Sequence, residues 1–276
     1  MKFYPCAKVN LGLNIIRRRE DGYHDLETVF YPIPLFDELT VTLVTDDKEH
    51  SASCSLTLQG TPIESNTDDN LVCRAYHLLA QHHPLPPMHV VLNKHIPTQA
   101  GLGGGSSDAA AMLQAVNILA KLHLDNQTLK NYAALLGADC AFFIDSKPAY
   151  ATGIGEKLTP IDLDLKGWSM LLVKPDDPVS TREAYAGITP AMTEHCCKDV
   201  VRLPVKEWQH LLTNDFENTI LPHHPAIDEA REKLISMKPA YVQMSGSGST
   251  VFALSQEPFN LSTADMKDWW YKEIIL

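Results

Sequence analysis

The sequence of 276 residues has no long hydrophobic run and little positive charge. No apolar stretch reaches the length that a membrane-spanning helix needs, and the N-terminal residues lack the hydrophobic centre of a secretory signal. Lysine and arginine total 23 residues against 34 aspartates and glutamates, which makes the formal net charge −11. A surface for nucleic acid or anionic lipid normally carries a basic face. From these absences we expect a cytoplasmic protein with no membrane and no nucleic-acid partner.

Cysteines are few and show no pairing pattern. The six cysteines contain no Cys-x-x-Cys pair, and they are too sparse for a disulfide framework in a chain of this length. Free thiols are therefore the favoured interpretation. A zinc site at His195, Cys196 and Cys197 is a weaker alternative, because adjacent cysteines rarely reach one metal together.

Four of the 14 glycines fall within residues 101–105. Glycine in a helix or strand costs backbone entropy and adds no side chain to pack, so this stretch is predicted to be a loop with bare peptide N–H groups. Ser106, Ser107 and Asp108 follow as good helix N-caps, and the alanines after them favour a helix. A glycine loop that leads into a helix N-terminus favours a bound phosphate.

Two common nucleotide-binding loops are excluded by what this stretch lacks. A Walker loop needs a lysine after its glycines, and a dinucleotide-binding loop needs a third glycine where Asp108 stands. A flexible surface loop is the remaining alternative, but a linker would not need the apolar residues Ala100 and Leu102 among its glycines. We therefore predict a polyphosphate-binding loop of another kind.

The rest of the chain mixes strands and helices. Its apolar periodicity predicts strands at residues 7–15, 39–43, 88–96 and 168–173, and helices at residues 71–82, 129–136, 180–186, 205–212 and 226–237. Residues 150–156 are rich in turn formers and are predicted to connect two domains. A second glycine turn, Ser245–Ser249, lies between two apolar strands, where a simple hairpin would explain it equally well.

Two segments contain candidates for chemistry. Asp139 lies in an otherwise apolar run, where an unpaired carboxylate is costly, so it needs either a partner or a task. Lys8 and Asn10 share the polar face of the predicted half-buried strand at residues 7–15. The alternatives are a helix N-cap for Asp139 and a solvated strand face for Lys8 and Asn10.

The stretch Pro97-x-x-x-Gly-Leu-Gly-Gly-Gly-Ser-Ser-Asp-Ala109 resembles the ATP-binding loop of the GHMP kinases. Ala7-Lys-Val-Asn-Leu11, Asp21-Gly-Tyr-His24, Gly137-Ala-Asp139 and the turn at residues 245–249 are similar to those GHMP kinases that phosphorylate a cytidine diphosphate-linked methylerythritol for isoprenoid synthesis without mevalonate. The resemblance spans nearly the whole chain. One departure is that Cys140 and Ala141 stand where the family usually has a proline.

The resemblance implies an α+β protein with the two-domain GHMP kinase fold. The N-terminal domain would be ribosomal protein S5 domain 2-like, and the C-terminal domain would be a ferredoxin-like α/β sandwich. The turn-rich connector places the boundary between residues 1–152 and residues 153–276.

The resemblance also implies which residues act. Lys8 and Asp139 match the catalytic pair, with Asp139 as the base and Lys8 as its electrostatic partner. The small-molecule substrate would contact Asn10, Tyr23, His24 and Tyr185, with aromatic rings stacked on the cytosine. ATP, arriving with Mg²⁺ near Ser106 or Ser107, would be bound by Asn70, Leu71, Lys94, Pro97, Gly101, Leu102, Gly103, Gly104, Gly105, Ser106 and Ser107.

Three alternatives stay open at this point. Tyr185 also fits a core residue of a helix. A GHMP kinase for a smaller acceptor, such as homoserine or mevalonate, would share the glycine loop but would give two aromatic rings no base to stack on. A nucleotide-binding sensor without turnover is the third alternative, and the presence of both Lys8 and Asp139 argues against it.

Overall fold

The computed structural model describes residues 1–44, 53–62, 69–191, 193–261, 266 and 269–276. The chain forms two compact units. Unit 1 comprises residues 1–7, 35–98 and 103–147, and unit 2 comprises residues 8–34, 99–102 and 148–276. Neither unit is a single stretch of sequence, and the division at residues 152 and 153 stays a prediction of where two family domains meet.

Unit 1 is built on one sheet. Its four strands lie in the order β1 (Lys2–Phe3), β4 (Glu38–Leu43), β6 (Met88–Lys94) and β5 (Cys54–Gly60). The central strand β6 pairs antiparallel with β4 and parallel with β5. Its side chains alternate between buried and half-buried, because a strand presents successive side chains to opposite faces of the sheet.

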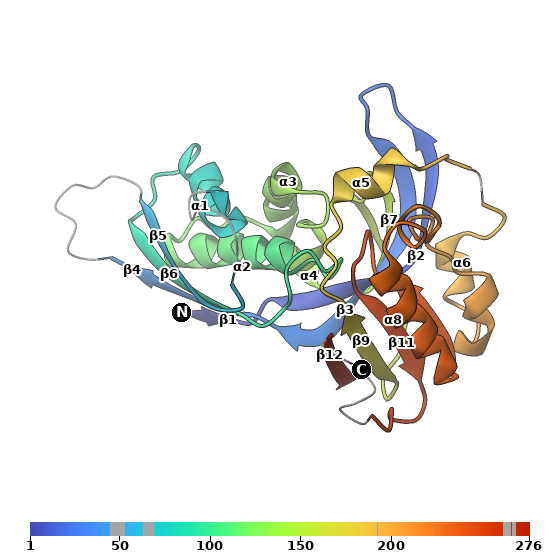
Figure 1. Cartoon of the computed structure of the whole chain (residues 1–276). Helices are drawn as coiled ribbons and strands as arrows, with labels where there is room; N and C mark the ends of the chain where they lie inside the picture. The colour runs from blue at the N-terminus through green and yellow to red at the C-terminus, as the bar shows by residue number, and fades with distance from the viewer. Residues whose placement is uncertain (45–52, 63–68, 192, 262–265, 267–268) are drawn as a thin grey trace. The chain divides into compact units, whose positions relative to one another are not determined.

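The helices of unit 1 are α1 (Leu71–Ala80), α2 (Gly104–Leu119), α3 (Asn126–Leu136) and the short α4 (Phe142–Asp145). Figure 1 shows α1, α2 and α3 on one face of the β4–β6–β5 sheet. Asn70 and Asp125 cap α1 and α3, since their side chains accept hydrogen bonds from Val72 N and Thr128 N. Helix α2 packs against α1, α3, α4 and β4, so it is held from several sides.

The first sheet of unit 2 contains the two longest strands. Its order is β2 (Cys6–Arg18), β3 (His24–Phe36), β7 (Ala149–Gly153) and β8 (Lys157–Pro160). Residues 7–15 of β2 are buried without exception, including Lys8, Asn10 and Asn14. The expected half-buried strand and its solvated alternative are therefore wrong: both faces of this segment are covered, and its polar side chains are bonded inside the protein.

The second sheet of unit 2 is antiparallel throughout, in the order β10 (Tyr241–Met244), β11 (Val251–Ser255), β9 (Ser169–Lys174) and β12 (Trp270–Ile275). Helix α8 (Pro225–Ser236) packs against β9, β10 and β11. Together they bury a shared apolar core, whose members include Val173, Ala253 and Leu234. This strand order is that of a ferredoxin-like α/β sandwich, as predicted for the C-terminal half.

Smaller helices complete unit 2: α5 (Thr181–Ala186), α6 (Cys197–Val200), the 3-10 helix η2 (Val205–His210) and α7 (Glu217–Ile220). The helices expected at residues 180–186 and 226–237 are confirmed as α5 and α8, whereas the one expected at residues 205–212 is a shorter 3-10 helix. The connector expected at residues 150–156 is wrong in part, because residues 149–153 pair with β3 as a strand. None of the described helices is long and apolar enough to cross a membrane.

Candidate active site

Helix α2 begins inside the glycine cluster. Gly103 is its N-cap, with a φ of 70° that favours glycine, and Ser107 N donates the first helical hydrogen bond to Gly103 O at 2.9 Å. Ser106, Ser107 and Asp108 therefore lie within the first turns, and their expected role as N-caps is wrong. Helix geometry gives the N–H groups of Gly104, Gly105 and Ser106 no acceptor within the helix, and they point along the positive end of the helix dipole.

The absence of a side chain at Gly104 is required by its surroundings. A Cβ there would lie 2.9 Å from Ile96 Cγ2 and 3.2 Å from Lys94 Nζ, closer than packed atoms normally approach. On the loop before it, Ala100 and Leu102 are buried. These two residues anchor the loop, so the alternative of a flexible surface linker is wrong.

Lys94 lies at the end of β6 and is buried with two carboxylates. Its Nζ donates to Asp37 Oδ2 and, at 2.8 Å, to Asp108 Oδ2 in the second turn of α2. Burial, opposed by the charge of Lys94 and assisted by that of Asp37, raises the pKa of Asp108 to about 7. Burial alone would lower the pKa of Lys94, but its two carboxylate partners outweigh that and raise it. The pairs join β6 to the start of α2.

Asn70, Leu71 and Lys94, which the resemblance assigns to ATP, come together near the same helix start. Asn70 caps α1, and Leu71 Cδ1 lies 3.6 Å from where a Cβ of Gly105 would stand. Lys94 is close to Gly104, but its ammonium is engaged by Asp37 and Asp108. Sequence reasoning missed Asp37, whose only signal is that it stands with Glu38 between two apolar strand segments.

Asp139 lies in a tight turn between α3 and α4. Its backbone carbonyl accepts a hydrogen bond from Phe142 N at 3.2 Å, and Cys140 N donates to Gly137 O at 3.1 Å. The N-cap of α4 is Ala141, without a side-chain cap, so the alternative of Asp139 as an N-cap is wrong. The turn forms without the proline that the family usually has.

The turn of Asp139 contacts the start of α2 within unit 1. Burial raises the pKa of the Cys140 thiol to about 11, and the neighbouring Ser106 hydroxyl partly offsets that rise. Helix α2 also packs against α4, and Gln114 Nε2 donates to Ile144 O at 3.0 Å. The turn that contains Asp139 therefore lies at the N-terminal end of α2, where the glycine loop leads into the helix.

Lys8 lies in unit 2, on β2, and its side chain is held at a defined position. Lys8 Nζ donates to Asn10 Oδ1 at 2.6 Å and to Gly101 O at 3.1 Å, and it lies 5.1 Å from the centre of the Phe30 ring. Asn10 Nδ2 donates in turn to Thr28 Oγ1. Lys8 and Asp139 belong to different units, and their pairing stays a prediction.

The second glycine turn holds Gly101. A Cβ on Gly101 would lie 1.9 Å from Ser245 O, and the φ of Gly101 is 71°, so only glycine fits there. Ser245 Oγ donates to Gly101 O at 2.9 Å and accepts from Asn10 N at 3.2 Å. Gly101 O thus accepts from both Ser245 and Lys8. Sequence reasoning identified this turn but missed Ser245 as the residue that links it to the loop, and the turn is more than a simple hairpin.

The aromatic residues form a different arrangement from the expected pair. Tyr23 follows the turn between β2 and β3 and is 61% exposed. His24 stacks on Tyr185 of α5, with ring centres 4.9 Å apart and planes inclined by 18°. Tyr185 also contacts the Phe216 ring edge-on, with ring centres 4.8 Å apart. Tyr185 therefore packs on the apolar core and also stacks on His24. Burial, and then the charge of Arg18, lower the pKa of His24, which keeps its ring neutral near pH 7.

Metal ligands are not clustered in the described residues, where no group of three His, Cys, Asp or Glu side chains is arranged to hold a metal ion. The zinc alternative at His195, Cys196 and Cys197 is wrong. Cys196 Sγ lies 2.9 Å from Glu27 Oε2, and Cys197 Sγ lies 3.3 Å from Asn14 Nδ2, so both thiols have other partners. The six cysteines, all of them in the part of the chain that the structure describes, form no disulfide.

Comparison with known proteins places this architecture in a class. The family model described as GHMP kinases N terminal domain matches residues 70–147, and the one described as GHMP kinases C terminal matches residues 198–264. A mevalonate kinase structure from Methanococcus jannaschii shares the fold, with a TM-score of 0.68 over 99% of this chain and 97% of that chain at 14% identity. The predicted α+β fold of the GHMP kinases, which use ATP as phosphate donor, is confirmed.

Nearer relatives share a single name. A 4-diphosphocytidyl-2-C-methyl-D-erythritol kinase of Bacteroides fragilis is 49% identical over 96% of this chain and 95% of its own length. One of Porphyromonas gingivalis is 41% identical over 97% of both chains. The crystal structure of a 4-(cytidine 5′-diphospho)-2C-methyl-D-erythritol kinase is 34% identical, with a TM-score of 0.78 over 94% of this chain and 91% of that chain. The chain belongs to the family of 4-diphosphocytidyl-2-C-methyl-D-erythritol kinases.

Replacement of Lys94 by methionine tests the buried ion pairs. Lys94→Met leaves Asp37 and Asp108 buried without their counter-charge, so we expect the free energy of unfolding to fall by about 3–5 kcal/mol. Urea denaturation followed by circular dichroism measures it. Lys2→Met, which breaks the exposed pair with Glu38, is the matched control and should have a far smaller effect. Equal effects of the two substitutions would show that the buried pairs are not what holds unit 1 together.

Proposed function

We propose that this kinase transfers the γ-phosphoryl group of ATP to the 2-hydroxyl of 4-(cytidine 5′-diphospho)-2-C-methyl-D-erythritol, giving the 2-phosphate in the non-mevalonate route to isoprenoids. The observation that carries the proposal is the N-terminal end of α2. There the glycine loop leaves backbone N–H groups without helical acceptors, and the turn of Asp139 lies beside them. Phosphoryl transfer needs positioned phosphates, neutralised charge and a group that accepts the acceptor's proton. The choice of acceptor is supported by relatives named for it across nearly the whole chain.

We assign the phosphates of ATP to residues 101–107. Backbone N–H groups at a helix N-terminus bind phosphate oxygens. Gly104 and Gly105 have no side chain that would occupy the space beside these N–H groups. Mg²⁺ that arrives with ATP neutralises phosphate charge, and the half-buried Ser106 suits it better than the buried Ser107. Asn70 and Leu71 take the purine side, while Pro97 leads into the loop. Lys94 contributes by holding the helix start through Asp108.

We assign the proton transfer to Asp139, whose carboxylate accepts the proton of the substrate hydroxyl as that oxygen attacks phosphorus. Lys8 supplies the positive charge that stabilises the ionised oxygen. Its ammonium is already oriented by Asn10 Oδ1 and Gly101 O, so little reorganisation is needed. No covalent enzyme intermediate is required.

We assign the cytosine to Tyr23, His24 and Tyr185. A base gains about 1–3 kcal/mol by stacking on an aromatic side chain. The neutral His24 ring has one donor and one acceptor nitrogen, which suits the polar edge of a base. A smaller acceptor such as homoserine or mevalonate would leave these rings without a function.

The first test is ADP release with MgATP and four acceptors: the cytidyl-methylerythritol, free methylerythritol phosphate, homoserine and mevalonate. We expect turnover with the cytidyl compound alone. Turnover with a small acceptor would keep the roles of Lys8 and Asp139 but remove the base-binding role of the aromatic residues. ATP binding without turnover on any acceptor would instead support a nucleotide-binding sensor.

Asp139→Asn keeps the shape of the side chain but removes its ability to accept a proton. We expect kcat to fall by at least about 10²-fold, the lower end of general-base contributions, with ATP affinity nearly unchanged. Steady-state kinetics and calorimetric titration with ATP measure the two quantities. Asp145→Asn on the neighbouring helix α4 is the matched control. Near-normal turnover of Asp139→Asn would remove this residue from the mechanism.

Tyr23→Ala removes an exposed ring that we assign to the cytosine. We expect the KM for the cytidyl substrate to rise about tenfold, while the KM for ATP changes little. Tyr4→Ala is the matched control, since Tyr4 is similarly exposed, at 59%, and lies in unit 1. A larger change in the KM for ATP than for the acceptor would contradict the assignment.

A further inference from the structure

His224 immediately precedes α8 and lies between two carboxylates of unit 2. Its Nδ1 is 2.8 Å from Asp177 Oδ1, and its Nε2 is 3.2 Å from Glu183 Oε1, while its side chain is only 11% exposed. Both ring nitrogens donate only when the imidazole is protonated. Burial alone would lower the pKa of His224, but the hydrogen bonds and charges of Asp177 and Glu183 outweigh it and raise the pKa.

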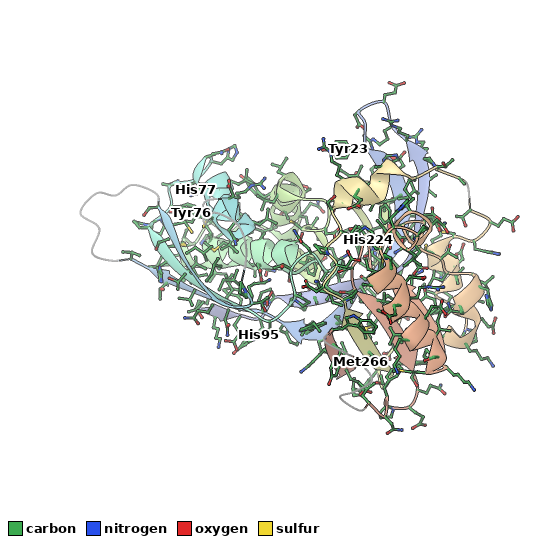
Figure 2. All side chains as sticks on the ribbon, in the orientation of Figure 1. Tyr23, Tyr76, His77, His95, His224 and Met266 are labelled. Atoms are coloured by element: carbon green, nitrogen blue, oxygen red, sulfur yellow. The ribbon has the colours of Figure 1, made fainter. Side chains whose placement is uncertain are left out.

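These two bonds connect three segments of unit 2. Asp177 belongs to the segment that leaves β9, Glu183 lies on α5, and His224 begins α8. Figure 2 shows His224 between α5 and α8. The bridge therefore ties α5 and the segment before it to the helix that covers the second sheet.

Helix α5 depends on such contacts because it has only six residues. An isolated helix of that length is unstable in water, so tertiary contacts decide where it lies. Besides the bridge, Thr219 Oγ1 donates to Ala184 O at 3.1 Å, and the Tyr185 ring packs on Phe216. Tyr185 is the α5 residue that stacks on His24.

We propose that His224 is a positioning residue for recognition of the cytidine moiety, holding α5 through Asp177 and Glu183 so that Tyr185 presents its ring beside His24. This inference rests on the proposed function, because it assumes that Tyr185 contacts the base. His224 itself touches neither the substrate nor the reacting atoms. It acts on the affinity for the cytidyl substrate, and neither ATP binding nor proton transfer depends on it.

The bridge makes a definite prediction about pH. A histidine whose pKa is raised in the folded protein contributes fully below its unfolded value of about 6.5, and loses that contribution as the pH rises through the folded value. The charged groups that face His224 are Asp177 and Glu183, and Asp228 on α8 donates its backbone N–H to His224 O. The KM for the cytidyl substrate should therefore rise with pH above about 6.5. His24 has a lowered pKa and titrates below this window.

The test compares His224→Gln with His223→Gln, a matched change at the exposed neighbouring residue. Kinetics from about pH 5.5 to pH 9 give the KM values for the cytidyl substrate and ATP, and calorimetry gives the Kd for cytidine 5′-diphosphate. For His224→Gln at pH 6 we expect the KM for the cytidyl substrate and the Kd for cytidine 5′-diphosphate to rise at least about threefold. The KM for ATP should be unchanged, and the dependence of the acceptor KM on pH should be lost.

Two further variants keep the outcome decisive. Glu183→Gln removes the negative charge of the α5 partner at a side chain that is 50% exposed, so it serves if His224→Gln does not fold, and it should raise the same KM. Tyr185→Ala separates the two levels of the argument. If Tyr185→Ala weakens binding of cytidine 5′-diphosphate but His224→Gln and Glu183→Gln do not, the positioning role is wrong and the proposed function stands. If Tyr185→Ala has no effect, the base assignment fails and the inference fails with it.

Discussion

The buried pairing of Lys94 with Asp37 and Asp108 is the interaction on which the start of α2 in unit 1 depends. Asp37 also accepts hydrogen bonds from the backbone N–H groups of His95 and Ile96, so one carboxylate orders the end of β6. Asp108 extends the same network into α2. Because buried charges are stable only when paired and hydrogen bonded, this network allows little displacement of the helix start.

Unit 2 fixes its part of the glycine loop through a different set of hydrogen bonds. Gly101 O accepts from Lys8 Nζ and from Ser245 Oγ, and Ser245 also accepts from Asn10 N. One loop carbonyl thus fixes the ammonium that we assign to charge stabilisation. The Lys8 ammonium that we assign to phosphoryl transfer is therefore preoriented by its neighbours, so binding energy is not spent on ordering it.

Much of the fold and part of the candidate site could be predicted from the sequence. Glycine density and the alanines after it identified the loop and helix α2, but the start of that helix was placed too late. N-cap propensity favoured Ser106 to Asp108, whereas the left-handed Gly103 and the packing of Gly104 against Ile96 allow the helix to begin earlier. Local preference was overruled there by a tertiary contact.

The sequence by itself determined the family and the glycine loop before α2, and it supplied the candidates that we propose for phosphate binding and catalysis, because these depend on residue types at short spacings. Only the tertiary structure decided the partners of Lys94, the bond from Ser245 to Gly101 and the burial of β2 on both faces. It also showed that His24 rather than Tyr23 stacks on Tyr185. Each of these joins residues far apart in the chain, and local spacing carries no information about which distant groups a fold brings into contact.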